Sequence, residues 1–142
     1  MAERKMARRG AFIAAGEHAP AVQRCDPERV GEYAAAWIDA CQAEGVLACA
    51  KHFPGHGRTT VDSHKELPRV DTPAEVLRET DLIPFQRAIE RGVASVMSAH
   101  VAFPALDPSG MPSTLSKAIL TDLLRKEMEF TGLVVTDALI ME

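Results

Sequence analysis

Short apolar stretches alternate with amphipathic segments of helical length along this chain. Residues 46–50 and 133–136 are nearly uninterrupted apolar runs, and residues 93–101 contain a third. Such runs are typical of parallel strands that are covered on both faces. Between them, apolar positions recur every three or four residues, as they do in helices that pack one face against a sheet. This alternation predicts an α/β fold with a parallel sheet.

The first predicted helix has a clear beginning and end. Asp26 can cap its N-terminus, and Pro27 suits the first helical position because proline has no backbone N–H to leave unpaired. Gly45 is a typical residue to end the helix. One apolar stripe is predicted on this helix, formed by Val30, Tyr33, Ala34, Trp37, Ile38 and Cys41.

Further helical segments are predicted in the second half of the chain. Residues 72–75 (T-P-A-E) match a capping box, with proline at the first helical position. Residues 81–91 form a helix that tolerates Pro84 in its first turn and ends at Gly92. The last helix ends before Gly132, and its predicted apolar stripe is Leu115, Ile119, Leu123 and Leu124.

The composition is that of a folded globular domain. The 142 residues are 46% hydrophobic and 25% charged, with a formal net charge of -4. These values argue against intrinsic disorder and against the basic surface of a nucleic-acid-binding protein. No apolar stretch approaches the roughly 20 residues of a membrane-spanning helix. We therefore expect neither a nucleic acid nor a membrane as a partner.

The N-terminal 25 residues carry little structural information. Basic residues within 4–9 precede an apolar run over 11–15, which is shorter than the hydrophobic core of a secretory signal peptide. We treat residues 1–25 as a poorly determined N-terminal segment and residues 26–142 as one partial domain.

The three cysteines are an odd number without a C-x-x-C pair. This pattern fits neither a disulfide framework nor a zinc ribbon. Cys41 and Cys49 are therefore interpreted as small buried apolar residues. A reducing compartment fits this usage best, so we expect a cytoplasmic location, although export of a full-length form stays open.

Polar residues follow all three predicted strands. Lys51 and His52 come after the first, His100 after the second and Asp137 after the third. The carboxyl ends of parallel strands lie at one edge of a sheet, and this edge carries the active site in α/β enzymes. His100 is either a ligand contact or a buried histidine with a satisfied hydrogen bond.

The densest group of reactive side chains is residues 51–57 (K-H-F-P-G-H-G), followed by Asp62 and His64. A carboxylate bonded to one imidazole nitrogen leaves the other nitrogen to exchange a proton, so Asp62 and His64 could form a general acid–base pair. The alternative is a solvated polar loop. A metal site is disfavoured, because the spacing of His52, His56, Asp62 and His64 matches no familiar ligand motif and lysines lie beside them.

Asp137 is either the cap of a following helix or a reactive carboxylate, and its position alone does not decide between them. Near Lys51 and His52 it would stay ionised, and it could then act as a nucleophile.

These motifs together resemble family 3 of the glycoside hydrolases, and specifically its bacterial β-N-acetylglucosaminidase branch. The resemblance rests on residues 51–57 joined to D-S-H at residues 62–64. Residues 97–101 (M-S-A-H-V) and 134–141 (V-V-T-D-A-L-I-M) are similar to the same family in the same order. The resemblance to the family extends from about Asp26 to the C-terminus.

The resemblance implies a (β/α)8 barrel, of which this chain would form about three central β/α units. It also implies retaining hydrolysis of terminal β-linked N-acetylglucosamine from cell-wall fragments, without a cofactor or metal. Asp137 matches the family's nucleophile, and His64 with Asp62 matches its acid/base. Lys51 and His52 match residues that hold the sugar hydroxyls, and His100 is a further candidate contact.

The sequence departs from the family pattern near both of its ends. The family has a sugar-binding arginine just ahead of the first helix. The usual spacing places Ala21 there, with Arg24 nearby but displaced. The earlier barrel strands are expected to have no counterpart in residues 1–25, and the barrel strands that follow Asp137 in the family are expected to have none either. Because unpaired strand edges expose apolar surface, we expect the isolated piece to have low stability or activity, or to associate with itself.

Two alternatives to hydrolysis stay open. A phosphorylase on the same scaffold would use phosphate instead of water, and a histidine acid/base would not repel this anion as a carboxylate would. A noncatalytic, truncated sugar-binding fragment is the other alternative.

Overall fold

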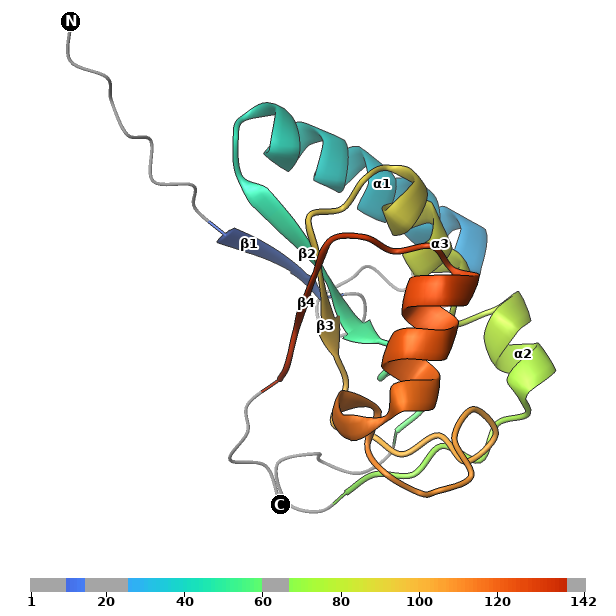
Figure 1. Ribbon diagram of the computed structural model, residues 1–142. Coiled ribbons are helices and arrows are strands. Elements are labelled where there is room, and N and C mark those ends of the chain that lie inside the picture. Colours follow the sequence, from blue (N-terminus) through green and yellow to red (C-terminus); the bar gives the residue numbers. More distant parts are fainter. Residues whose placement is uncertain (1–9, 15–25, 60–66, 138–142) are drawn as a thin grey trace, which may run out of the picture.

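The computed structural model of the chain describes residues 10–14, 26–59 and 67–137. In this part the chain forms a four-stranded sheet with helices packed against it (Figure 1). Neighbouring strands run parallel and follow each other in chain order, so the predicted α/β architecture is confirmed. The strands are β1 (Gly10–Ala14), β2 (Leu47–Phe53), β3 (Ser95–Ser98) and β4 (Leu133–Val135).

Strand β1 was not predicted from the sequence. It pairs with β2 from Gly10 opposite Leu47 to Ala14 opposite Lys51. The expectation that residues 1–25 hold no earlier strand of the sheet is therefore wrong. Residues 11–15 are an apolar run as long as the predicted strand at 46–50, but they follow a basic cluster and were considered only as the core of a signal peptide.

The helices lie on one side of the sheet (Figure 1). This arrangement is expected when in-order parallel strands are joined by right-handed crossovers. None of the helices in the described part of the chain is long and apolar enough to cross a membrane. The helices are α1 (Pro27–Ala43), α2 (Ala74–Glu79), α3 (Ile83–Glu90), the 3-10 turn η2 (Ser113–Leu115) and the π-helix η3 (Ala118–Glu127).

Helix α1 begins as predicted but buries a different face. The Asp26 carboxylate accepts hydrogen bonds from the backbone N–H groups of Glu28 (3.1 Å) and Arg29 (3.4 Å). Of the predicted stripe, Ile38 is fully buried, whereas Tyr33 is 50% exposed and Trp37 39% exposed. The buried face of α1 is instead Gly31, Ala35 and Ile38.

Small residues dominate that face because α1 packs closely against α3. A Cβ added at Gly31 would lie only 2.7 Å from Cγ of Arg87 on α3. The aromatic side chains that periodicity assigned to the core therefore point outward, since close helix packing favours the small residues at the contact.

The predicted capping box at residues 72–75 is wrong. Helix α2 starts at Ala74, and Pro73 occupies the cap position with no side-chain cap hydrogen bond. Thr72 therefore lies one residue too early for its hydroxyl to cap the helix. The prediction for α3 holds better, because Pro84 lies in its first turn and Gly92, with a φ of +67°, follows its end.

Helix η3 also begins later than its predicted stripe. Leu115 is 62% exposed and belongs to η2, so its assignment to the apolar face was wrong. Ile119, Leu123 and Leu124 are buried as predicted. The helix is wound more widely than an α-helix, and the N–H of Met128 bonds to the carbonyl of Leu123, five residues earlier (2.9 Å).

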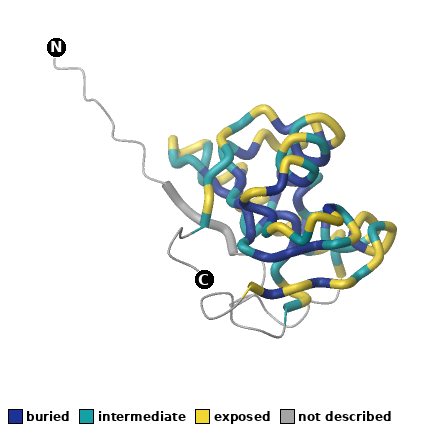
Figure 2. The backbone as a smooth tube through the Cα atoms, turned by 60° about the horizontal axis from the view of Figure 1, so that its bottom comes forward, coloured by how far each residue is buried: buried dark blue, intermediate teal, exposed yellow. Residues whose placement is uncertain are grey.

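The hydrophobic core lies between the sheet and its helices, and Figure 2 shows the buried backbone inside an exposed shell. Phe53 at the end of β2 and Phe85 on α3 meet edge to face, with ring centroids 5.2 Å apart. This contact fixes the carboxyl end of β2 against α3. Cys49 is buried as predicted and Cys41 is half-buried, and both thiols are free. Burial raises the pKa of the Cys49 thiol.

The β4 side of the sheet exposes apolar surface. Leu133 on β4 is 62% exposed, and Val134 and Val135 are half-buried. This exposure agrees with the expected apolar edge, whereas self-association through it stays a prediction.

A buried carboxylate ties the loop before η2 to the start of η3. Asp107 is buried and accepts a hydrogen bond from the Ser116 hydroxyl and another from the backbone N–H of Ser109 (2.9 Å). Ser116 Oγ in turn accepts from the N–H of Ile119 (3.1 Å). The bonds from Ser116 and Ser109 lower the pKa of the Asp107 carboxyl.

We predict that Asp107→Asn destabilises the protein by about 1 kcal/mol at pH 7. A lowered native pKa stabilises the fold above the unfolded pKa of about 3.9, and the stabilisation is lost as the pH falls through the native value. The asparagine mimics the protonated carboxyl, so the difference from the parent should shrink at acidic pH. Urea unfolding at pH 7 and at acidic pH measures this, and an undiminished difference in acid would contradict it.

Candidate active site

The carboxyl end of β2 carries two of the predicted site residues. Lys51 and His52 lie inside β2 and not after it as predicted, because the strand continues to Phe53. The pairing of β2 with β3 shifts register between Lys51 and Phe53, and the peptide bonds Lys51–His52 and Phe53–Pro54 are cis. Both polar side chains are half-buried, whereas Phe53 beside them is fully buried.

A short contact between an imidazole and a carboxylate joins β2 to the segment after β4. His52 Nε2 lies 3.2 Å from Oδ2 of Asp137, and the two side chains are 21% and 23% exposed. The residues are far apart in the chain but close in space because β2 and β4 end at the same edge of one parallel sheet. The structure thus brings together the predicted nucleophile and one of the predicted sugar contacts, in partial contact with solvent.

His56 lies next to this pair. Its ring centroid is 5.7 Å from that of His52, with the planes tilted by 56°. Its Nδ1 lies 3.2 Å from the hydroxyl of Thr59, which also donates to the carbonyl of His56 (3.1 Å). Among the described residues, no group of three His, Cys, Asp or Glu side chains is placed to hold a metal ion.

Three predicted site residues lie outside the described part of the chain: Arg24, Asp62 and His64. His100 is described. It lies two residues beyond β3 and is half-buried, and no hydrogen bond or ion pair joins it to another described residue.

Two buried hydroxyls support the site and were missed from the sequence. Ser98 Oγ donates to Thr114 Oγ1 (3.1 Å) and also lies 3.5 Å from the carbonyl oxygen of Val135. Thr114 donates in turn to the carbonyl of Ala99 (3.2 Å). These bonds link the ends of β3 and β4, from which Asp137 follows. A serine inside the apolar run of β3 was the only sequence sign of this network.

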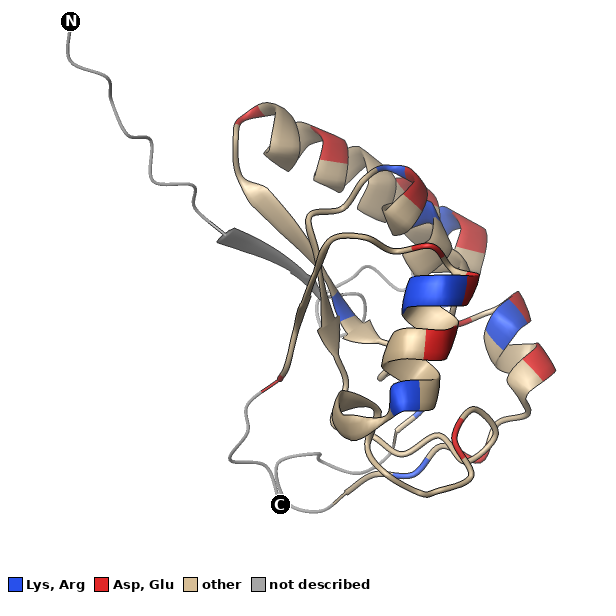
Figure 3. Cartoon of the chain, in the orientation of Figure 1, with Lys and Arg blue, Asp and Glu red and all other residues tan. Residues whose placement is uncertain are grey.

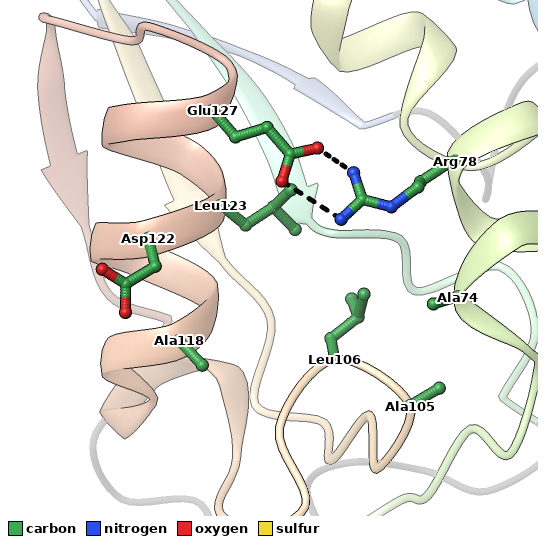
Figure 4. A pocket seen from close by; sticks show the side chains of 8 residues that line it. All are labelled: Ala74, Arg78, Ala105, Leu106, Ala118, Asp122, Leu123 and Glu127. Carbon is green, nitrogen blue, oxygen red and sulfur yellow. Dashed lines mark hydrogen bonds and ion pairs between the residues drawn. The ribbon is translucent and has the colours of Figure 1, made fainter.

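The charged residues on the described helices are of both signs. Figure 3 shows basic and acidic residues mixed along α1, α2 and η3. A cavity of about 260 Å³ opens between α2 and η3, where Arg78 and Glu127 form an ion pair, with Nη2 3.1 Å from Oε2 (Figure 4). None of the predicted site residues lines this cavity.

The sequence profile of the glycosyl hydrolase family 3 N-terminal domain matches residues 23–142. The chain belongs to glycosyl hydrolase family 3. The resemblance seen in the sequence motifs is therefore confirmed at the level of the family.

A curated protein and a solved structure are similar to this chain over most of its length. Beta-hexosaminidase A of Pseudoalteromonas piscicida is 42% identical over 127 residues, which cover 82% of this chain and 21% of that protein. The solved structure of a family 3 beta-N-acetylglucosaminidase from Paenibacillus sp. str. FPU-7 is 47% identical, with a TM-score of 0.77, over 79% of this chain and 21% of the other.

A beta-glucoside phosphorylase is also similar in structure. It is 35% identical, with a TM-score of 0.78, over 82% of this chain and 22% of the phosphorylase. The chain thus spans about a fifth of the length of each of these three relatives.

We predict that Thr114→Val lowers the free energy of unfolding by about 1–2 kcal/mol, because it leaves the buried Ser98 hydroxyl and Ala99 carbonyl without this partner. Urea denaturation followed by circular dichroism measures the change. Thr131→Val, at an exposed position, is the matched control and should change the stability little. Equal stability of the two variants would show that the buried hydroxyls do not hold the strand ends.

Proposed function

We propose that the protein is a retaining β-N-acetylglucosaminidase that removes terminal β-linked N-acetylglucosamine from cell-wall fragments. The observation that carries this proposal is the contact between His52 and Asp137 at the carboxyl edge of a parallel sheet, in a chain of family 3. The names of the hexosaminidase and glucosaminidase relatives support the substrate class.

The proposal includes a (β/α)8 barrel, of which the described sheet would be one part. In-order parallel strands with their helices on one side are the arrangement that such a barrel repeats. The open carboxyl edge of the sheet would then face the barrel mouth, where substrates bind.

Asp137 would act as the nucleophile. Its carboxylate attacks the anomeric carbon of the bound sugar, and the bond between that carbon and the glycosidic oxygen breaks as a glycosyl-aspartate forms. The 3.2 Å contact with His52 Nε2 orients the carboxylate, and 23% exposure leaves its side chain within reach of a ligand.

His64 would serve as the acid and then as the base. It donates a proton to the departing oxygen, and the resulting neutral imidazole takes a proton from the water that releases the sugar from Asp137. Asp62 holds the imidazole in the required tautomer. Two inversions at the anomeric carbon give net retention of configuration.

Lys51 and His52 would bind sugar hydroxyls, and His100 would be a further sugar contact. The Lys51 ammonium is a donor of hydrogen bonds, and hydroxyl oxygens accept them. Half-burial of Lys51 and His52 supports this role, because such side chains are held in place by their neighbours and still reach solvent. We place the reaction in the cytoplasm, and no cofactor takes part in it.

We predict that Asp137→Ala lowers kcat on an aryl β-N-acetylglucosaminide by a factor on the order of 10³ or more. It should also abolish covalent trapping by a slow fluorinated analogue of that substrate. Mass spectrometry of the trapped protein locates the label, and Asp122→Ala on η3, whose side chain is 44% exposed and pairs with Lys117 and Lys126, is the control. A label on any residue other than Asp137 would refute the assignment of the nucleophile.

A phosphorylase is the second candidate, and its specific support is the similarity of this chain to a beta-glucoside phosphorylase. In that reaction phosphate in place of water would attack the glycosyl-aspartate. The product would be a sugar 1-phosphate.

We predict that the product is free N-acetylglucosamine both in a buffer without phosphate and in a phosphate buffer of the same pH. A hydrolase needs no phosphate, because water completes its second step. Chromatography of the products with a sugar 1-phosphate standard measures this. Formation of the 1-phosphate as the main product would establish the phosphorylase instead.

A further inference from the structure

Asp81, at the junction of α2 and α3, forms an ion pair with the loop that follows β2. Arg58 Nε donates to Oδ2 of Asp81 at 2.8 Å. The Asp81 side chain is only 12% exposed and that of Arg58 is 37% exposed. Partial burial distinguishes this pair from the solvent-exposed pairs of the chain, such as Arg69–Asp71, whose side chains are 60% and 67% exposed. A partly buried ion pair is screened less by salt than an exposed one.

A second contact fixes the direction of the Arg58 guanidinium. Its Nη2 donates to Thr80 Oγ1 at 2.9 Å, and this hydroxyl lies 2.7 Å from Oδ2 of Asp81. The planar guanidinium is therefore held at two nitrogens, which fixes its orientation as well as its position.

Asp81 also packs against the start of the same loop. Gly55 is buried and has a φ of +149°, a conformation that side chains with a Cβ rarely adopt. A Cβ at this position would lie 3.1 Å from both Oδ1 and Cβ of Asp81. The absence of a side chain at Gly55 lets the backbone lie directly on the carboxylate.

These contacts hold a four-residue segment, 55–58, at both of its ends. His56 lies inside this segment, and its ring is the one that packs beside His52. Thr59, just after Arg58, lies 3.2 Å from Nδ1 of His56 and limits its rotation. A continuous series of contacts thus leads from Asp81 through residues 55–58 to His56, then to His52 and to Asp137.

We propose that Asp81 is a positioning residue for Asp137. By holding segment 55–58, it keeps the His56 ring against His52, and His52 in turn keeps the Asp137 carboxylate in the orientation for attack. Asp81 itself lies outside the group that would touch the sugar. The effect on catalysis rests on the proposed function, whereas the effect on the two histidines does not.

The test uses the full chain and compares Asp81→Asn with Asp71→Asn. Both changes remove the charge of a carboxylate bonded to an arginine and keep its shape, but of the two only Asp81 contacts segment 55–58 within the described part of the chain. Long-range ¹H–¹⁵N NMR spectra report the tautomer and environment of each imidazole. We expect the signals of His52 and His56 to shift in Asp81→Asn and to stay unchanged in Asp71→Asn.

Kinetics provide the second measurement. We expect kcat on an aryl N-acetylglucosaminide to fall roughly tenfold in Asp81→Asn with a smaller change in KM, because a misplaced nucleophile slows the chemical step more than binding. A loss of stability alone would lower the amount of active protein and leave the histidine signals of the folded fraction as in the parent.

Arg58→Gln breaks the same ion pair by changing its more exposed partner. This variant can therefore test the proposal if Asp81→Asn does not fold. It should produce the same histidine shifts, and the double variant should add little to them. Unchanged His52 and His56 signals in Arg58→Gln would overturn the proposal. If the parent protein hydrolyses no N-acetylglucosaminide, the proposed function fails, and the NMR comparison still decides whether Asp81 positions the histidines.

Discussion

Parallel pairing of the strands is the constraint on which the rest of this structure depends. Because β2, β3 and β4 run in the same direction and pair in chain order, all three end at one edge of the sheet. The crossovers between them place the helices on one side, and the core fills the space between the two layers. His52 and Asp137 are far apart in the sequence, and they meet because β2 and β4 end at this common edge.

Two groups of contacts hold the candidate site in place at this edge of the sheet. The buried hydroxyls of Ser98 and Thr114 link the ends of β3 and β4. Phe53 packs on Phe85, and this contact fixes the last residue of β2 against α3. A carboxylate that must attack one carbon atom needs such rigid support, because a small displacement of the nucleophile lowers the rate steeply.

Most features governed by local sequence were predicted correctly, and the capping box at residues 72–75 is the exception. Strands β2, β3 and β4 could be predicted because each lies in a largely apolar stretch of the sequence, and the start of α1 because Asp26 and Pro27 act within their own turn. The polar residues at the strand ends were found for the same reason. The family motifs then suggested their roles, and the structure places two of them, His52 and Asp137, in contact.

Features that depend on packing between distant segments were not predictable. Periodicity placed Tyr33 and Trp37 in the core, but the close approach of α1 to α3 selects Gly31 and Ala35 for the contact. The partner of Arg58 could not be foreseen either, because two charged residues 23 positions apart look like any other pair in a mixed-charge sequence.

The outward position of Trp37 has a practical consequence. It is the only tryptophan of the chain and lies on α1 with 39% of its surface exposed. Its fluorescence therefore comes from one known place on the outer layer, away from the core. Any molecule or segment that covers this side of α1 shields the indole from water and moves its emission to shorter wavelength, so the protein carries its own optical reporter for contacts on that layer.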